Sequence, residues 1–139
     1  MRAAFWVRVV AVVALLQFGG CGHETGPKRI PVEGEVLYDG EPVKQGMISF
    51  VPSQGPPVQT PIENGRYRVD YKGGVPAGTS RVEIQGFREG PREVVLAAGS
   101  PPQKEVVQYI APKYNRDSVL TVEISEGEPN VYDFPLLSR

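Results

Sequence analysis

Apolar and polar residues alternate in several short segments of this sequence, and glycine or proline stands between the segments. In NGRYRVDY, Tyr67, Val69 and Tyr71 share one face of an extended strand, and the charged residues between them share the other. A period of two places one face of a strand against a core and the other in water. The Asn-Gly pair before this strand is a strong signal for a tight turn. The sequence therefore predicts strands joined by turns, and no helix after Cys21.

The same alternation recurs along the chain, and the 16 glycines and 14 prolines cluster between the alternating segments. Together with a less regular segment, KEVVQYI, these make about seven strands over roughly 110 residues, which is typical of two packed sheets. We therefore expect an all-β fold, a seven-stranded antiparallel β-sandwich with an Ig-like architecture. Besides those of NGRYRVDY, the residues expected on the core-facing side of the strands are Val32, Gly34, Val36, Tyr38, Ile48, Phe50, Val82, Ile84, Leu120, Val122, Ile124, Tyr132, Phe134 and Leu136.

Two proline-rich segments, residues 53–61 and 86–103, are expected to be long loops. Long loops on a rigid sandwich are where binding sites are usually built. Tyr109 and Tyr114 are not assigned to the inward face of a strand, so they are the candidate aromatic platform for a ligand such as a sugar ring.

The segment APKYNRDS around Tyr114 has a second interpretation, which we favour, as a plain connection between strands. Pro112 would set a turn, and Tyr114 would pack at the edge of the core with its hydroxyl bonded. Asn115 and Asp117 would bond nearby backbone groups, as short polar side chains do in turns.

The first twenty residues have the order of a secretory signal: a basic residue, an apolar block and a small-residue end. The uninterrupted apolar block, residues 9–16, would form only about 12 Å of helix, whereas a bilayer core is roughly 30 Å thick. A permanent membrane span is therefore disfavoured. We expect residues 1–20 to be a lipoprotein signal peptide, residues 21–29 a flexible tether, and residues 30–139 the folded domain.

Cys21 is the only cysteine of the chain and directly follows the small residues Gly19 and Gly20. The run from Phe18 to Cys21 resembles the lipobox of bacterial lipoproteins, although Phe18 stands where an aliphatic residue is usual. This resemblance implies that the Cys21 thiol accepts a diacylglycerol and becomes the mature N-terminus, which would anchor the protein firmly to a membrane. An ordinary secretory signal with an incidental thiol, or an uncleaved anchor, is the alternative.

Charge and residue content exclude several classes of function. Without residues 1–20 the chain has 13 basic and 16 acidic side chains, a net charge of −3, so we expect no nucleic-acid partner. The single histidine, His23, lies in the expected tether, which argues against a histidine-dependent enzyme. Cys21, His23 and Glu24 could in principle bind a metal, but an acylated sulfur cannot be a ligand. We expect no catalytic residue, no metal site and no cofactor.

Two carboxylate pairs deserve a separate test, because such pairs can hydrolyse glycosides when they face each other across a cleft. The pairs are Glu33 with Glu35 and Glu123 with Glu126. Glu33 and Glu35 alternate outward along a strand, so we interpret them as solvated positions rather than a catalytic site.

The runs VEGEVLYDGEPVKQGMISFVP, NGRYRVD and VPAGTSRVEI resemble the carboxypeptidase regulatory-like domain, a transthyretin-like (prealbumin-like) sandwich. The run IAPKYNRDSVLTVEISEGEPNVYDFPL resembles the end of small lipoproteins with this domain in planctomycete-type bacteria. The resemblance covers residues 30–137 and implies a seven-stranded sandwich without an enzymatic site.

These observations predict a non-enzymatic protein that is exported and lipid-anchored in the bacterial cell envelope. Its membrane contact would be the lipid on Cys21, and its sandwich would act as a structural or protein-interaction module. The alternative is a carbohydrate-binding module at the cell surface, with Tyr109 and Tyr114 as the candidate platform. The envelope partner, protein or polysaccharide, is not identified by the sequence.

Overall fold

The computed structural model describes residues 26–127 and 129–139, so the predicted signal peptide and Cys21 lie outside the described residues. Within the described ranges the fold is all-β, and its only helical elements are two short 3₁₀ turns. No helix in this part of the chain is long and apolar enough to cross a membrane. The predicted fold class is confirmed.

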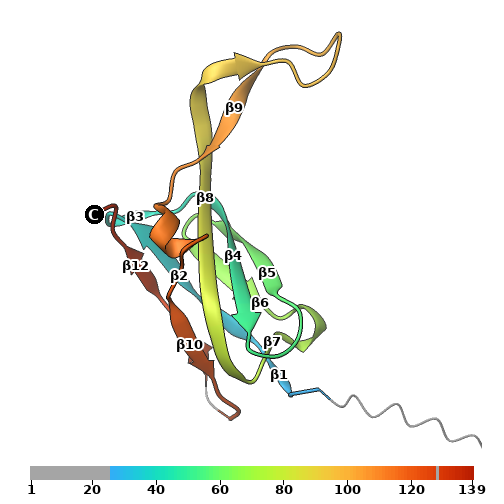
Figure 1. Cartoon of the computed structure of the whole chain (residues 1–139), viewed down its shortest axis with the longest axis vertical. Helices are drawn as coiled ribbons and strands as arrows, with labels where there is room; N and C mark the ends of the chain where they lie inside the picture. The colour runs from blue at the N-terminus through green and yellow to red at the C-terminus, as the bar shows by residue number, and fades with distance from the viewer. Residues whose placement is uncertain (1–25, 128) are drawn as a thin grey trace, which may run out of the picture.

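Strands β1 to β12 and the turns η1 and η2 follow one another along the chain (Figure 1). Their bounds are β1 (Arg29–Ile30), β2 (Val32–Tyr38), β3 (Glu41–Pro42), β4 (Gln45–Pro52), β5 (Val58–Glu63), β6 (Arg66–Val69), η1 (Tyr71–Gly73), β7 (Val75–Pro76), β8 (Gly78–Val94), β9 (Gln103–Gln108), η2 (Pro112–Tyr114), β10 (Thr121–Ile124), β11 (Asn130–Val131) and β12 (Phe134–Leu136).

One large sheet has the order β10-β8-β4-β5-β6-β2-β11, and β12 continues beside β2 after β11. The sheet curls so that its first and last strands meet: the Tyr132 hydroxyl donates to the carbonyl of Glu123 in β10. All pairings are antiparallel except those of β11 and β12, which run parallel to β2. A small second sheet pairs β1 with β7.

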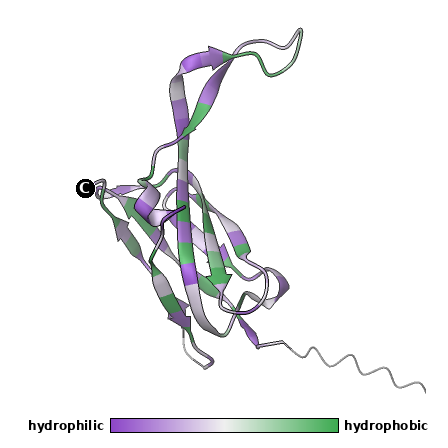
Figure 2. Ribbon diagram, viewed as in Figure 1, coloured by the Kyte–Doolittle hydropathy of each residue, from purple (hydrophilic) through white to green (hydrophobic). Residues whose placement is uncertain are grey.

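The core lies inside the curled sheet. Figure 2 shows hydrophobic and hydrophilic residues alternating along the strands. Most side chains that the sequence assigns to the core are buried, whereas Tyr38, Leu120 and Tyr132 are half-buried at its edge. Ile62, Val75 and Ile110 join the core without having been predicted. The buried apolar side chains are Ile30, Val32, Val36, Val43, Ile48, Phe50, Ile62, Tyr67, Val69, Val75, Val82, Ile84, Ile110, Val122, Ile124, Phe134 and Leu136.

Three local predictions are wrong. Tyr71 is 75% exposed, because β6 ends at Val69 and η1 turns the chain before the alternation can continue. Residues 58–61 of the predicted loop 53–61 belong to β5, where Pro61 is tolerated because β5 pairs with β6 at a single residue pair. Arg29, placed in the tether, begins β1, and its guanidinium donates to the carbonyl of Gly74.

The predicted loop 86–103 is also wrong in most of its length. β8 runs on through Val94, and β9 pairs back onto it, so the two form a hairpin that projects from the sandwich (Figure 1). We call this hairpin, residues 87–108, the arm. Neither face of the arm is covered by a second layer, so no core imposes a period of two on its sequence.

Candidate functional site

A groove lies at the base of the arm, where β4 begins and β8 leaves the sandwich. Its volume is about 1150 Å³, and we call it the arm-base groove. Met47, Pro61 and Phe87 supply apolar surface, Arg88 comes from β8, and Tyr109 directly follows β9. Glu41, Lys44, Glu63 and Glu89 also line the groove, so it combines apolar surface with more charged side chains than a small-ligand site usually has.

Tyr109 lies in this groove with its ring half-enclosed. The ring of Tyr38 meets it edge-on, with centroids 5.6 Å apart and planes at 73°. The Arg88 guanidinium carbon lies 5.0 Å from the Tyr109 centroid, which is a cation–π distance. Partial burial raises the pKa of Tyr109, and the charge of Arg88 opposes this shift. A sugar could stack on the ring face under Arg88 only if the guanidinium moved aside.

Gly86 explains how Tyr109 reaches this position. An alanine Cβ at Gly86 would lie 2.9 Å from Ile110 Cδ1 and 3.0 Å from Tyr109 Cε1. The missing side chain therefore leaves room for both residues to lie across β8.

Tyr114 belongs to a different part of the surface. It lies in η2, outside the arm-base groove, and its hydroxyl accepts a hydrogen bond from the backbone N–H of Leu137 at 3.1 Å. Pro112 begins this turn, and the Asn115 side chain bonds the backbone. The segment is therefore the strand connection that the sequence favours, and Tyr109 and Tyr114 do not line one platform.

The Asn115 side chain is buried and holds three carbonyl groups together. Its Nδ2 donates to the carbonyls of Ile84 at 3.3 Å, Ile110 at 3.2 Å and Ala111 at 3.1 Å. Ile84 is in the middle of β8, so this amide fixes the returning chain to the base of the arm.

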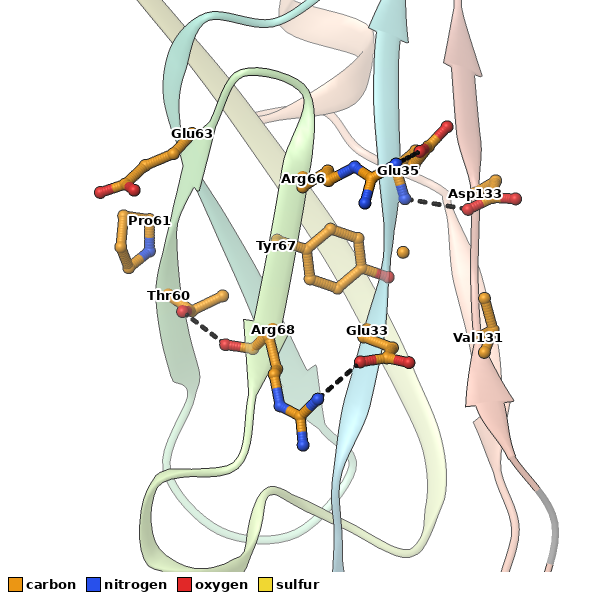
Figure 3. A pocket seen from close by; sticks show the side chains of 11 residues that line it. Glu33, Glu35, Thr60, Pro61, Glu63, Arg66, Tyr67, Arg68, Val131 and Asp133 are labelled. Atoms are coloured by element: carbon orange, nitrogen blue, oxygen red, sulfur yellow. Dashed lines mark hydrogen bonds and ion pairs between the residues drawn. The ribbon is translucent and has the colours of Figure 1, made fainter.

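A second depression, of about 780 Å³, lies over β2 and β6 and carries charged side chains (Figure 3). Arg66 pairs with Glu35 and Arg68 pairs with Glu33, both at 3.0 Å, on a well-exposed surface. The carboxylate of Asp133 accepts the backbone N–H of Glu35 at 2.9 Å and so replaces a missing ladder acceptor between β11 and β12. Glu33 and Glu35 each have an arginine partner, which is the arrangement of a solvated sheet face.

The second carboxylate pair considered in the sequence, Glu123 with Glu126, does not form a joint site either, because each side chain has its own partner. Glu123 accepts a hydrogen bond from Thr79 at 2.6 Å, and Glu126 pairs with Lys28 at 3.0 Å. Among residues 26–127 and 129–139, no group of three or more His, Cys, Asp or Glu side chains could hold a metal ion.

The buried hydroxyl of Tyr67 should make the stability of the fold depend on pH in the alkaline range. This hydroxyl donates to the carbonyl of Tyr132 at 2.7 Å, and burial, reinforced by the charge of Asp133, raises its pKa. A raised folded pKa means that the stabilisation is complete below the unfolded pKa of about 10 and is lost as the pH rises toward the folded value. We expect the free energy of unfolding to fall above about pH 10, and to fall less steeply in Tyr67→Phe. Urea unfolding at a series of alkaline pH values measures this, and an unchanged slope in Tyr67→Phe would contradict it.

The groove-lining residues Met47, Pro61, Phe87 and Arg88 were not predicted as site residues. They come from three strands that meet only in the folded chain, so no local pattern marks them. Gly86 was the one weak sequence signal for this site, because a glycine within a strand often marks a place where another part of the chain approaches the backbone closely.

Comparison of the chain with family models, with curated proteins and with solved structures found no match. The resemblance to the carboxypeptidase regulatory-like domain therefore stays a prediction.

Proposed function

We propose that this chain is a non-enzymatic, lipid-anchored protein of the bacterial cell envelope, with the arm as its interaction surface. The observation that carries the proposal is the arm itself, which exposes apolar side chains without a covering layer. Val95 is 58% exposed, Leu96 73% and Val106 70%. Exposed apolar groups gathered on one projection are typical of a surface that contacts another molecule.

The end of the arm is also uncharged. No Asp, Glu, Lys or Arg occurs from residue 94 to residue 103, whereas Arg92, Glu93, Lys104 and Glu105 stand directly on either side. A charge-free end bounded by charged flanks suits contact with a protein surface better than contact with phosphate groups.

The position of the N-terminal end supports presentation of the arm away from a membrane. β1, which follows the predicted tether, lies at the end of the sandwich opposite the arm (Figure 1). β8 has 17 residues, so it spans about 55 Å at roughly 3.3 Å per residue. A lipid on Cys21 would thus hold one end of the molecule and leave the arm at the other.

Membrane fractionation tests the anchor. We expect the full-length protein expressed in a bacterial host to partition into the detergent phase, and Cys21→Ser to partition into the aqueous phase, because the thiol is the acceptor of the lipid. Ser53→Cys in the Cys21→Ser background is the control, since it restores a thiol in an exposed loop but not at the predicted acceptor position. Equal partitioning of wild type and Cys21→Ser would remove the anchor from the proposal.

Carbohydrate binding in the arm-base groove is the second candidate function, because Tyr109, Phe87 and Arg88 are of the residue types that hold sugars. We expect Tyr109→Ala to abolish retention on an immobilised envelope polysaccharide, and the exposed control Tyr71→Ala to leave it unchanged. If wild type is not retained on any polysaccharide offered, this candidate is withdrawn.

A further inference from the structure

A basic surface lies at the end of the sandwich opposite the arm, where β1 begins (Figure 1). A depression of about 1030 Å³ at this end is lined by Gly26, Pro27, Lys28, Arg29, Lys72 and Gly73. Among the residues that the structure describes, no acidic side chain lines it. We call Lys28, Arg29 and Lys72, together with the neighbouring Tyr71, the basic end. Its charges come from two segments that are far apart in the sequence, the start of β1 and the turn η1.

One glycine and two hydrogen bonds hold these segments together. A Cβ at Gly74 would overlap the carbonyl oxygen of Ile30, so only a glycine lets the chain after η1 lie this close to β1. The guanidinium of Arg29 donates to the carbonyl of Gly74 at 3.1 Å. The N–H of Ala77 donates to the carbonyl of Lys28 at 2.8 Å. The fold therefore fixes the two basic segments side by side.

Two of the three basic side chains keep an uncompensated charge. Lys28 pairs with Glu126 at 3.0 Å. The carboxylate of Asp70, which is close to Lys72 in the sequence, pairs instead with an arginine of β6 at 2.9 Å. Within the described ranges no carboxylate forms an ion pair with Arg29 or Lys72. The basic end is therefore positive on a chain whose formal net charge is −1.

Tyr71 adds exposed aromatic surface beside these charges. It is 75% exposed, and the Lys72 ammonium nitrogen lies 5.3 Å from the centroid of its ring. Tyrosine is enriched where a membrane meets water, because its ring is apolar and its hydroxyl is polar. Lysine and arginine are attracted to anionic headgroups at the same depth. The basic end thus combines the residue types of a membrane–water interface.

The length of the predicted tether determines which surface lies next to the basic end. Gly26 is five residues after Cys21. At no more than about 3.6 Å per residue, it lies within about 18 Å of a Cys21 that is held at a bilayer surface. The headgroups of the membrane that holds the lipid are therefore within reach of the basic end.

We propose that the basic end binds the anionic phospholipid headgroups of that membrane, with Arg29 and Lys72 at the phosphate groups and Tyr71 at the membrane–water boundary. This inference rests on the proposed function, in which Cys21 carries the lipid, and adds a second contact to it. The lipid alone leaves the sandwich free to turn about the tether. The second contact holds β1 and η1 against the membrane, so that the arm points away from it.

Fluorescence quenching in vesicles tests this contact in the full-length, lipid-modified protein. Trp6 is the only tryptophan and lies in the predicted signal peptide, so Tyr71→Trp places a single reporter in the mature chain. Lipids brominated near the headgroup quench a tryptophan that reaches the membrane–water boundary. Each basic side chain at an anionic surface strengthens binding about fivefold, so two of them favour contact by about 25-fold. We expect this increase in the ratio of quenched to unquenched reporter when phosphatidylglycerol is added to phosphatidylcholine vesicles.

Two further substitutions, each made together with Tyr71→Trp, assign the contact to the basic end. Lys72→Gln should lower the ratio in anionic vesicles about fivefold. Lys44→Gln is the matched control, because it removes the same charge from an exposed position at the arm-base groove, and we expect it to leave the ratio unchanged. Equal quenching in anionic and neutral vesicles, or an equal effect of Lys72→Gln and Lys44→Gln, would overturn the proposal.

Flotation of the same samples separates failure of this contact from failure of the anchor. Protein that floats with both kinds of vesicle but is not quenched in the anionic ones has the anchor and lacks the contact, which refutes this inference alone. Protein that floats only with anionic vesicles and is quenched there has the contact without the lipid. Protein that floats with neither refutes both.

Discussion

Gly34→Ala is expected to destabilise the domain by about 3 kcal/mol or more, one of the largest effects of any single substitution in this chain. A Cβ at position 34 would overlap the carbonyl oxygen of Tyr132 and would lie 3.0 Å from the Tyr67 hydroxyl. Tyr132 is on the segment between β11 and β12, so the methyl group would push these strands away from β2, and Tyr67 belongs to β6 on the other side of β2. Backbone atoms cannot move aside as a flexible side chain could.

Urea unfolding of the chain without residues 1–20 measures this effect. Gly26→Ala is the control, because nothing lies within 4 Å of the Cβ that it would add. We expect the midpoint of Gly26→Ala to match wild type. A Gly34→Ala variant with a wild-type midpoint would show that β11 and β12 do not lie against β2 as described.

Asn115→Asp is the second substitution with a large expected effect, a loss of about 3 kcal/mol or more in the free energy of unfolding. It removes the amide that donates to the carbonyls of Ile84, Ile110 and Ala111, and it brings a carboxylate against these three oxygens. Asn115→Ala also leaves the carbonyls without that donor but adds no charge, so we expect a smaller loss, about 2 kcal/mol.

The neighbouring Asp117→Ala serves as the control for this position. The Asp117 carboxylate is exposed and pairs with Arg116 at 3.3 Å, so its loss should change the free energy of unfolding by about 0.5 kcal/mol or less. Thermal and urea unfolding of the three variants give the ranking. If Asn115→Asp were as stable as Asp117→Ala, the amide would not fix the returning chain to β8.

The strands that could be predicted are those with one face in the core. Tyr67 and Val69 in β6, and Val122 and Ile124 in β10, alternate with exposed residues because the core enforces the period. Tyr71 shows the limit of this pattern: the alternation continues in the sequence for one more step, but η1 has already turned the chain. Period alone does not mark where a strand ends.

The arm could not be predicted for the opposite reason. Residues such as Arg88, Glu89 and Val106 face solvent on a two-stranded hairpin, so neither face requires apolar side chains.

In the candidate site, Tyr109 could be predicted because the sequence does not assign it to the inward face of any strand. Arg88 and Tyr38, which contact its ring, come from distant parts of the sequence, and only the fold brings them together. The sequence predicts that the Asn115 side chain bonds nearby backbone groups, but its hydrogen bond to the carbonyl of Ile84 is long-range and could not be predicted.

Energy transfer from the protein to a dye in the bilayer tests the central claim, a membrane anchor at one end and a presented arm at the other. The full-length protein in vesicles would carry a donor at Lys72→Cys, beside Gly26 to Arg29, or at Leu96→Cys, at the end of the arm. We predict efficient transfer from position 72 and weak transfer from position 96, because β8 alone separates the two ends by about 55 Å. Equal transfer from both positions, or stronger transfer from position 96, would contradict the account.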